Sequence, residues 1–157
     1  MKHIYLCVVL LLTGCGVDRT GDPPAAVKAS DLEAADPEMV AAIERARSTF
    51  DFFTENYKTM ENDGYSVKFG LKTPDDDLEY IWFNPIEISG NEIKAACANE
   101  PVNLPGLKPG DVRTLKRSEV ADWMIVVGKK CYGGFTIQVI TAKDPAVPPL
   151  FEFVDFE

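Results

Sequence analysis

Histidine is almost absent from this chain, and this decides which chemistry the chain can do. Its one histidine, His3, lies in an apolar N-terminal segment that we expect to be removed. Serine–histidine and cysteine–histidine catalysis, zinc sites built on imidazole and histidine pH switches are therefore excluded for the mature protein. Carboxylates, lysines, tyrosines and two cysteines, Cys97 and Cys131, remain.

A third cysteine, Cys15, has the surroundings of a lipid-modified thiol. Lys2 gives a positive start, residues 4–12 are apolar, and small residues lead into Cys15. This order is typical of a bacterial lipoprotein signal, in which the thiol takes diacylglycerol and the chain is cut just before it. Polarity returns at Asp18, too soon for a transmembrane helix of about 20 apolar residues. A plain secretory signal with a cysteine at its cleavage site stays open.

We therefore expect residues 1–14 to be a signal peptide and residues 15–35 to be a lipidated cysteine followed by a flexible spacer. Several acyl chains on one cysteine would tether the protein stably to a membrane. Gly16, not aspartate, follows Cys15, and this sorting pattern resembles that of outer-membrane lipoproteins. The expected location is the periplasmic face of the outer membrane, or the outer face of the cell membrane where a cell has only one.

The charge composition limits the classes of partner and ligand that the protein can bind. The 157 residues include 16 basic and 25 acidic side chains, a net charge of −9. Nucleic-acid affinity comes mainly from basic groups that neutralise phosphates, so we expect no nucleic-acid partner. The acids of 75–77 resemble a solvated turn more than a calcium loop, which needs spaced ligands and a closing bidentate acid. We expect no metal and no cofactor.

Cys97 and Cys131 lie in the part of the chain that would be exported. In an oxidising compartment, a disulfide between them would stabilise the fold by about 3 to 4 kcal/mol on the chain-entropy model. Two buried free thiols are the alternative. A reactive thiolate is disfavoured, since only Lys129 and Lys130 adjoin Cys131.

One long helix is predicted at the start of the folded part. Asp36, Pro37 and Glu38 supply an N-cap, a proline at the first helical position and a first-turn acid. Apolar residues then recur every three or four positions, which predicts one amphipathic helix that ends before Gly64. These residues are Met39, Ile43, Ala46, Phe50, Phe53, Tyr57 and Met60.

After Gly64 the apolar period changes to two, which predicts strands. The segments are 65–71, 78–84, 86–88, 92–95, 112–115, 123–127 and 135–141. Pro85 ends one strand or marks a bulge. The predicted fold is α+β, with one long N-terminal helix packed on an antiparallel sheet of five or six strands in a domain over 36–143. A proline-rich tail, 144–157, carries aromatic side chains that we expect to lie back on the domain or to face a partner.

Short motifs occur in a fixed order along this domain. They are Asp36-Pro37-Glu38-Met39, Thr49-Phe50, Tyr80-Ile81-Trp82-Phe83, Ile93, Asn99-Glu100-Pro101, Leu107-Lys108-Pro109-Gly110-Asp111, Asp122-Trp123-Met124 and Gly133-Gly134-Phe135-Thr136-Ile137. Together they resemble the YegJ-like bacterial family of domains of unknown function (DUF2314). The resemblance implies a small α+β domain, often exported or lipid-anchored, with no established activity. A similar Asp-Trp-Met segment occurs among proposed toxin-immunity proteins. Cys97 and Cys131 stand where the family is expected to have apolar residues, which favours the disulfide.

Six residues are candidates for a binding site: Asn99, Glu100, Asp122, Trp123, Gly133 and Gly134. Each also has a structural interpretation. Asn99 and Glu100 can form a turn, a tryptophan in a strand usually fills the core, and paired glycines can serve a tight bend. We expect the loop from Asn99 to Asp111 and the segment Asp122–Trp123 to lie at one end of the sheet.

The function predicted from the sequence is that of an uncharacterised envelope lipoprotein with a non-catalytic binding or inhibitor-like (immunity-like) role. Its partners would be the membrane, through the lipid anchor, and an envelope protein. Two alternatives stay open. One is a structural envelope component, and the other is a histidine-free hydrolase that uses carboxylates such as Glu100, Glu119 and Asp122. No catalytic residue is assigned.

Overall fold

The computed structural model describes residues 36–144 and 150–156. The predicted signal peptide, Cys15, the spacer to residue 35 and part of the tail lie outside the described residues. No helix in the described part is long and apolar enough to cross a membrane.

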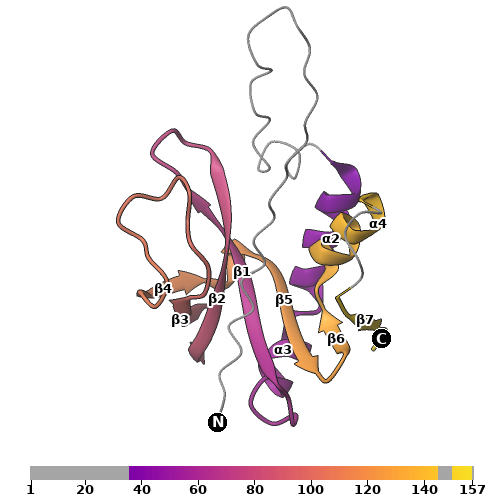
Figure 1. Cartoon of the computed structure of the whole chain (residues 1–157). Helices are drawn as coiled ribbons and strands as arrows, with labels where there is room; N and C mark the ends of the chain where they lie inside the picture. The colour runs from indigo at the N-terminus through magenta and orange to yellow at the C-terminus, as the bar shows by residue number, and fades with distance from the viewer. Residues whose placement is uncertain (1–35, 145–149, 157) are drawn as a thin grey trace, which may run out of the picture.

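One seven-stranded mixed sheet and three short helices make up the described fold (Figure 1). The helices are α2 (Pro37–Ser48), α3 (Phe50–Asn56) and α4 (Phe135–Lys143), with a 3₁₀ turn η1 (Arg117–Glu119). The strands are β1 (Gly64–Lys72), β2 (Leu78–Ser89), β3 (Glu92–Cys97), β4 (Val112–Lys116), β5 (Val120–Val127), β6 (Lys130–Gly133) and β7 (Glu152–Val154). Their order is β4-β3-β2-β1-β5-β6-β7, antiparallel except for the parallel pair β6 and β7. The prediction of a purely antiparallel sheet of five or six strands is therefore wrong.

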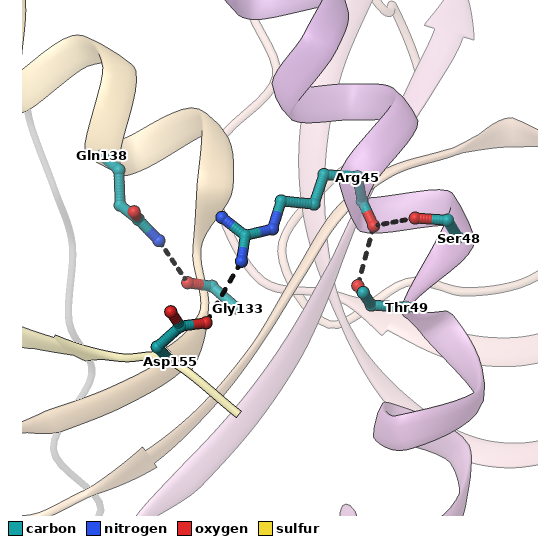
Figure 2. A network of polar contacts seen from close by, with 6 residues as sticks. All are labelled: Arg45, Ser48, Thr49, Gly133, Gln138 and Asp155. Carbon is teal, nitrogen blue, oxygen red and sulfur yellow. Dashed lines mark hydrogen bonds and ion pairs between the residues drawn. The ribbon is translucent and has the colours of Figure 1, made fainter. Parts of the chain in front are cut away.

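The prediction of one long N-terminal helix is also wrong. The helix starts as predicted, with the Asp36 carboxylate accepting from the Glu38 N–H at 3.0 Å, but it breaks at Thr49. The Ser48 and Thr49 hydroxyls donate back to the Arg45 carbonyl oxygen (Figure 2). The Trp123 indole N–H donates to the Ala46 carbonyl at 3.0 Å, an acceptor that an unbroken helix reserves for Phe50. Hydroxyl back-bonding and an inserted donor both bend helices.

Residues 135–141, predicted as a strand, belong to helix α4 instead. The run from Phe135 to Thr141 has no clear period, so the sequence did not separate a strand from a helix. Gly134, at φ 65°, turns the chain into the helix, and the Asp122 carboxylate accepts the Phe135 and Thr136 N–H groups. A carboxylate at this position stabilises the N-terminus of a helix.

The core lies between the sheet and helices α2 and α3. Val67 on β1 pairs with Phe83 on β2 and with Trp123 on β5, and all three side chains are fully buried. Phe156 from the tail packs on this core, with its ring centroid 4.5 Å from that of Phe52. The tail therefore lies back on the domain at this residue, as predicted. The Arg45 guanidinium also reaches Asp155, at 3.3 Å (Figure 2).

Cys97 and Cys131 are both buried free thiols, so the predicted disulfide is wrong. Cys97 lies on β3 and Cys131 on β6, with β2, β1 and β5 between them. Four strand spacings separate the two by roughly 19 Å, whereas bridged cysteines have Cα atoms about 4.4 to 6.8 Å apart. Burial raises the pKa of both thiols, that of Cys131 to about 12, with the Asp122 carboxylate adding to the rise. Both groups stay protonated at neutral pH and act as small apolar side chains.

Candidate functional site

Asp122 is a fully buried carboxylate near the start of strand β5. It accepts four hydrogen bonds, from the Trp123 N–H at 2.8 Å, the Phe135 N–H at 3.1 Å, and the N–H and hydroxyl of Thr136 at 2.8 and 2.6 Å. Burial raises the pKa of Asp122, while the bonds from Thr136 and the charge of Lys68 act in the opposite direction. The carboxylate joins β5 to the first turn of α4.

Lys68 supplies the positive charge beside this carboxylate. It pairs with Asp122 across β1 and β5, and its Nζ donates to the Thr136 hydroxyl at 3.4 Å. The same Nζ lies 5.2 Å from the Tyr80 ring centroid and 6.0 Å from that of Trp82, which are cation–π distances. An opposite charge and two aromatic faces therefore stabilise a lysine that is only 6% exposed.

A hydroxyl between a carboxylate and an ammonium is an arrangement that can activate a nucleophile. Thr136, however, is 1% exposed and Asp122 is 0% exposed. The Thr136 hydroxyl already donates a hydrogen bond to Asp122 and accepts one from Lys68. The geometry therefore serves to hold α4 against β5 and β1.

The glycine pair has a packing role. Gly133 has φ 76°, and a Cβ there would lie 2.2 Å from the Trp123 carbonyl oxygen. The next residue, Gly134, donates its N–H to that oxygen at 2.8 Å. Gly133 and Gly134 let the chain pass closely over Trp123, and both are buried.

Residues 98–111, the β3–β4 loop, are held by several side chains. The Glu79 carboxylate accepts the N–H groups of Val102 and Asn103 at 2.6 and 2.7 Å. Asn99 accepts the Trp82 N–H at 2.8 Å, and Asp111 accepts the Lys108 N–H at 2.9 Å. The loop is thus fixed at its start, tip and end, and the buried Leu107 anchors it to the core.

The tip of this loop nevertheless faces solvent. Val102 is 85% exposed, and Glu100 is exposed beside it. The β1–β2 turn projects from the same end of the sheet (Figure 1), and its Pro74 and Asp75 line a hollow of about 360 Å³ together with residues 100–108. The rigid loop, its exposed tip and this open hollow form the accessible candidate site, which we call the loop-end surface.

The structure brings only some of the sequence-predicted site residues together. The Asn99 side chain accepts a hydrogen bond from the Trp82 N–H. Trp82 on β2 lies opposite Lys68 on β1, which lies opposite Asp122 on β5. The loop and Asp122 therefore lie at one end of the sheet, as predicted. Four of the six candidate residues are buried and cannot belong to an exposed binding surface, namely Asp122, Trp123, Gly133 and Gly134. Asn99 is half-buried and Glu100 exposed, and both belong to the loop-end surface.

Sequence reasoning missed Lys68, Glu79 and Thr136. One signal was available: Asp122 is the only charged residue between Val120 and Val127, which predicts a buried partner for it. The clamp by Glu79, in which its carboxylate accepts two backbone N–H groups of the β3–β4 loop, has no such signal in the sequence. The donors lie more than 20 positions away along the chain. The described residues hold no group of three or more histidine, cysteine or acidic side chains placed to bind a metal.

The profile of a bacterial family described as "Uncharacterized protein conserved in bacteria (DUF2314)" matches residues 36–144. The chain belongs to this family. The motif resemblance is thereby confirmed, and the match includes Lys68, Glu79, Asp122, Thr136 and the loop-end surface.

Two curated relatives are similar to this chain. An uncharacterized protein YegJ of Escherichia coli K12 is 28% identical over 146 residues, which cover 92% of each chain. A putative ankyrin repeat protein of Neisseria meningitidis serogroup B is 30% identical over 118 residues, 69% of this chain and 47% of that protein. No solved structure gives a significant match.

Proposed function

We propose that this family member is a lipid-tethered, non-catalytic binding protein of the bacterial envelope, with an inhibitor-like or immunity-like role. Its partner is an envelope protein that docks on the loop-end surface. The observation that supports this most is the clamp by Glu79, which fixes the exposed tip at Val102 and Asn103.

A fixed loop lowers the cost of binding. A mobile loop must be ordered when a partner arrives, and that entropy subtracts from the affinity. Here the two charge-assisted hydrogen bonds that Glu79 accepts hold the tip in place before a partner arrives. Rigid scaffolds commonly carry recognition residues on loops of this kind.

The tip also offers suitable contacts. An apolar side chain as exposed as Val102 gains free energy when a partner covers it. Glu100 and Asp75 outnumber Lys108, the one basic residue of the lining, so the rim has a net negative charge, which favours a partner with basic groups and speeds its encounter. The proposed anchor at Cys15 would keep this surface close to partners in the same envelope.

Site-specific photo-crosslinking in intact membranes tests the proposal. A photo-reactive residue in place of Val102 should join the protein to a discrete partner, whereas the same residue in place of Glu61, exposed before β1, should not. Glu100→Lys should abolish the Val102 crosslink, and the matched change Glu61→Lys should keep it. The free energy of unfolding of both variants should lie within about 0.5 kcal/mol of the wild-type value, since they alter exposed positions.

Two outcomes would contradict the proposal. One is a Val102 position that joins no protein in intact membranes. The other is a crosslink that survives Glu100→Lys unchanged, because the negative rim would then play no part in docking.

A further inference from the structure

Strand β4 is an edge strand of the described sheet. Its pairing with β3 shows which of its backbone groups point away from the sheet. The Cys97 N–H donates to the Asp111 carbonyl, and the Arg117 N–H donates to the Asn91 carbonyl, both at 2.9 Å. Since hydrogen-bonded pairs alternate in an antiparallel ladder, Arg113 and Leu115 also face β3 with their backbone groups. Val112, Thr114 and Lys116 therefore direct their N–H and C=O groups outward.

One end of this edge is already closed. The Lys116 N–H donates to the Glu119 carboxylate at 2.8 Å. Val112 and Thr114 have no hydrogen-bond partner among the described residues for their outward groups, and both side chains are exposed. An edge of this kind can accept one more strand.

The two charged side chains of strand β4 are basic. β4 carries Arg113 and Lys116 and no acid, although the chain has a net charge of −9. Past Lys116 lies a hollow of about 360 Å³, lined by Arg47, Phe50, Asn91, Lys116, Arg117 and Ser118. Asp51 pairs with Arg117 at 2.9 Å. Arg47 donates its Nε–H to the Val120 carbonyl, and its remaining guanidinium N–H groups have no hydrogen-bond partner among the described residues.

We propose that the β4 edge is a second interaction surface, which takes an extended acidic segment of a partner protein as an added strand. The segment pairs its backbone with Val112 and Thr114 and directs carboxylates to Arg113 and to the basic hollow. A second copy of this chain is a poorer occupant, because two β4 strands would bring like charges together and each chain is strongly acidic.

Fluorescence anisotropy with a synthetic peptide tests this proposal on the full lipidated chain in detergent micelles. The probe is a labelled seven-residue peptide that alternates glutamate with valine and threonine. One control peptide has lysine in place of glutamate. A second keeps the glutamates but has proline in place of the residues between them, so it has the same charge and cannot pair as a strand.

The protein variants separate backbone pairing from charge. Thr114→Pro removes an outward N–H without removing a bond to β3, and proline is tolerated on edge strands. Thr114→Val is its control, because it changes the side chain alone. Arg113→Glu reverses a charge on β4, and Lys129→Glu makes the same change at the exposed turn between β5 and β6.

The acidic strand peptide should bind the wild type, and its affinity should fall about ten-fold with Thr114→Pro and with Arg113→Glu. Thr114→Val and Lys129→Glu should leave it unchanged, and both control peptides should bind about ten-fold more weakly or not at all. If Thr114→Pro fails to fold, Arg113→Glu still tests the role of charge, and the proline peptide still tests pairing as a strand.

The proposal is overturned if the wild type does not bind the acidic peptide, or if it binds the proline peptide equally well. It is also overturned if sedimentation shows a dimer of the wild type that Thr114→Pro dissociates, since a second copy would then be the occupant.

Discussion

Replacing the buried carboxylate of Asp122 should destabilise the fold more than any surface change. In Asp122→Ala, the N–H groups of Phe135 and Thr136 lose their acceptor while buried, at a cost of about 1 to 3 kcal/mol each. Lys68 also loses its counter-charge in a site where it is 6% exposed, and breaking a buried pair costs about 3 to 5 kcal/mol. Because these effects overlap, we expect a total loss of about 4 to 5 kcal/mol, which approaches the whole stability of many domains.

Urea unfolding followed by tryptophan fluorescence measures this loss, since Trp123 is next to the altered residue. Asp122→Asn should lose less, about 2 to 3 kcal/mol, because its amide still offers one acceptor oxygen. Lys68→Met should rescue part of the loss in the Asp122→Ala background, because the unpaired charge is gone. A loss below about 1 kcal/mol for Asp122→Ala, or no rescue by Lys68→Met, would refute this account of the buried cluster.

The pH dependence of the same comparison has a definite sign. Burial raises the folded-state pKa of Asp122 above its model-compound value of 3.8. The folded state then holds this proton more tightly than the unfolded state, so the group's contribution falls as pH rises from about 3.8 through the folded pKa. The stability advantage of the wild type over Asp122→Asn should therefore shrink with rising pH in that window. An advantage that grows would show a lowered pKa instead.

Three further predictions test other parts of the account. Gly133→Ala should lower the free energy of unfolding by more than about 2 kcal/mol, because the φ of Gly133 is positive and a Cβ there would meet the Trp123 carbonyl. Gly128→Ala, where nothing lies within 4 Å of the new Cβ, should lower it by about 1 kcal/mol. Equal urea midpoints for the two variants would contradict this. Intact-mass analysis without reductant should show both Cys97 and Cys131 alkylated after unfolding and neither in the native state; two thiols that resist alkylation when unfolded would instead prove a bridge. Wild type grown with labelled palmitate should carry the label on Cys15 and lose it with Cys15→Ser, and an unlabelled protein that salt releases from membranes would contradict the anchor.

Local sequence signals predicted the parts of the fold that local interactions determine. The cap at Asp36 is present, and the alternation from Tyr65 to Leu71 lies within strand β1. The hairpin around Gly90 joins β2 to β3, and Pro85 lies where the pairing register shifts, which is the bulge that proline permits.

The errors share a cause that no local signal contains. At Thr49, where the helix breaks, the back-bonding of the Ser48 and Thr49 hydroxyls is local, but the second contribution comes from Trp123, 74 positions away, which donates to Thr49 and to Ala46. α4 is a helix because Asp122 caps it from another strand, and β7 pairs in parallel with β6 after a separation of about 20 residues. The disulfide was expected from compartment and residue type, whereas strand order decides whether two thiols can meet. For the candidate site, the Asn99-Glu100-Pro101 motif pointed to the loop and to Glu100, but the hydrogen bonds that Glu79 accepts depend on tertiary structure.

The central claim is that Glu79 holds the β3–β4 loop ready for a partner, and removing this clamp tests it most directly. In Glu79→Ala, crosslinking through a photo-reactive residue at position 102 in intact membranes should fall several-fold, while the amides of Val102 and Asn103 exchange hydrogen faster and the global stability changes little. Undiminished crosslinking from a loop shown by hydrogen exchange to be released would contradict the claim.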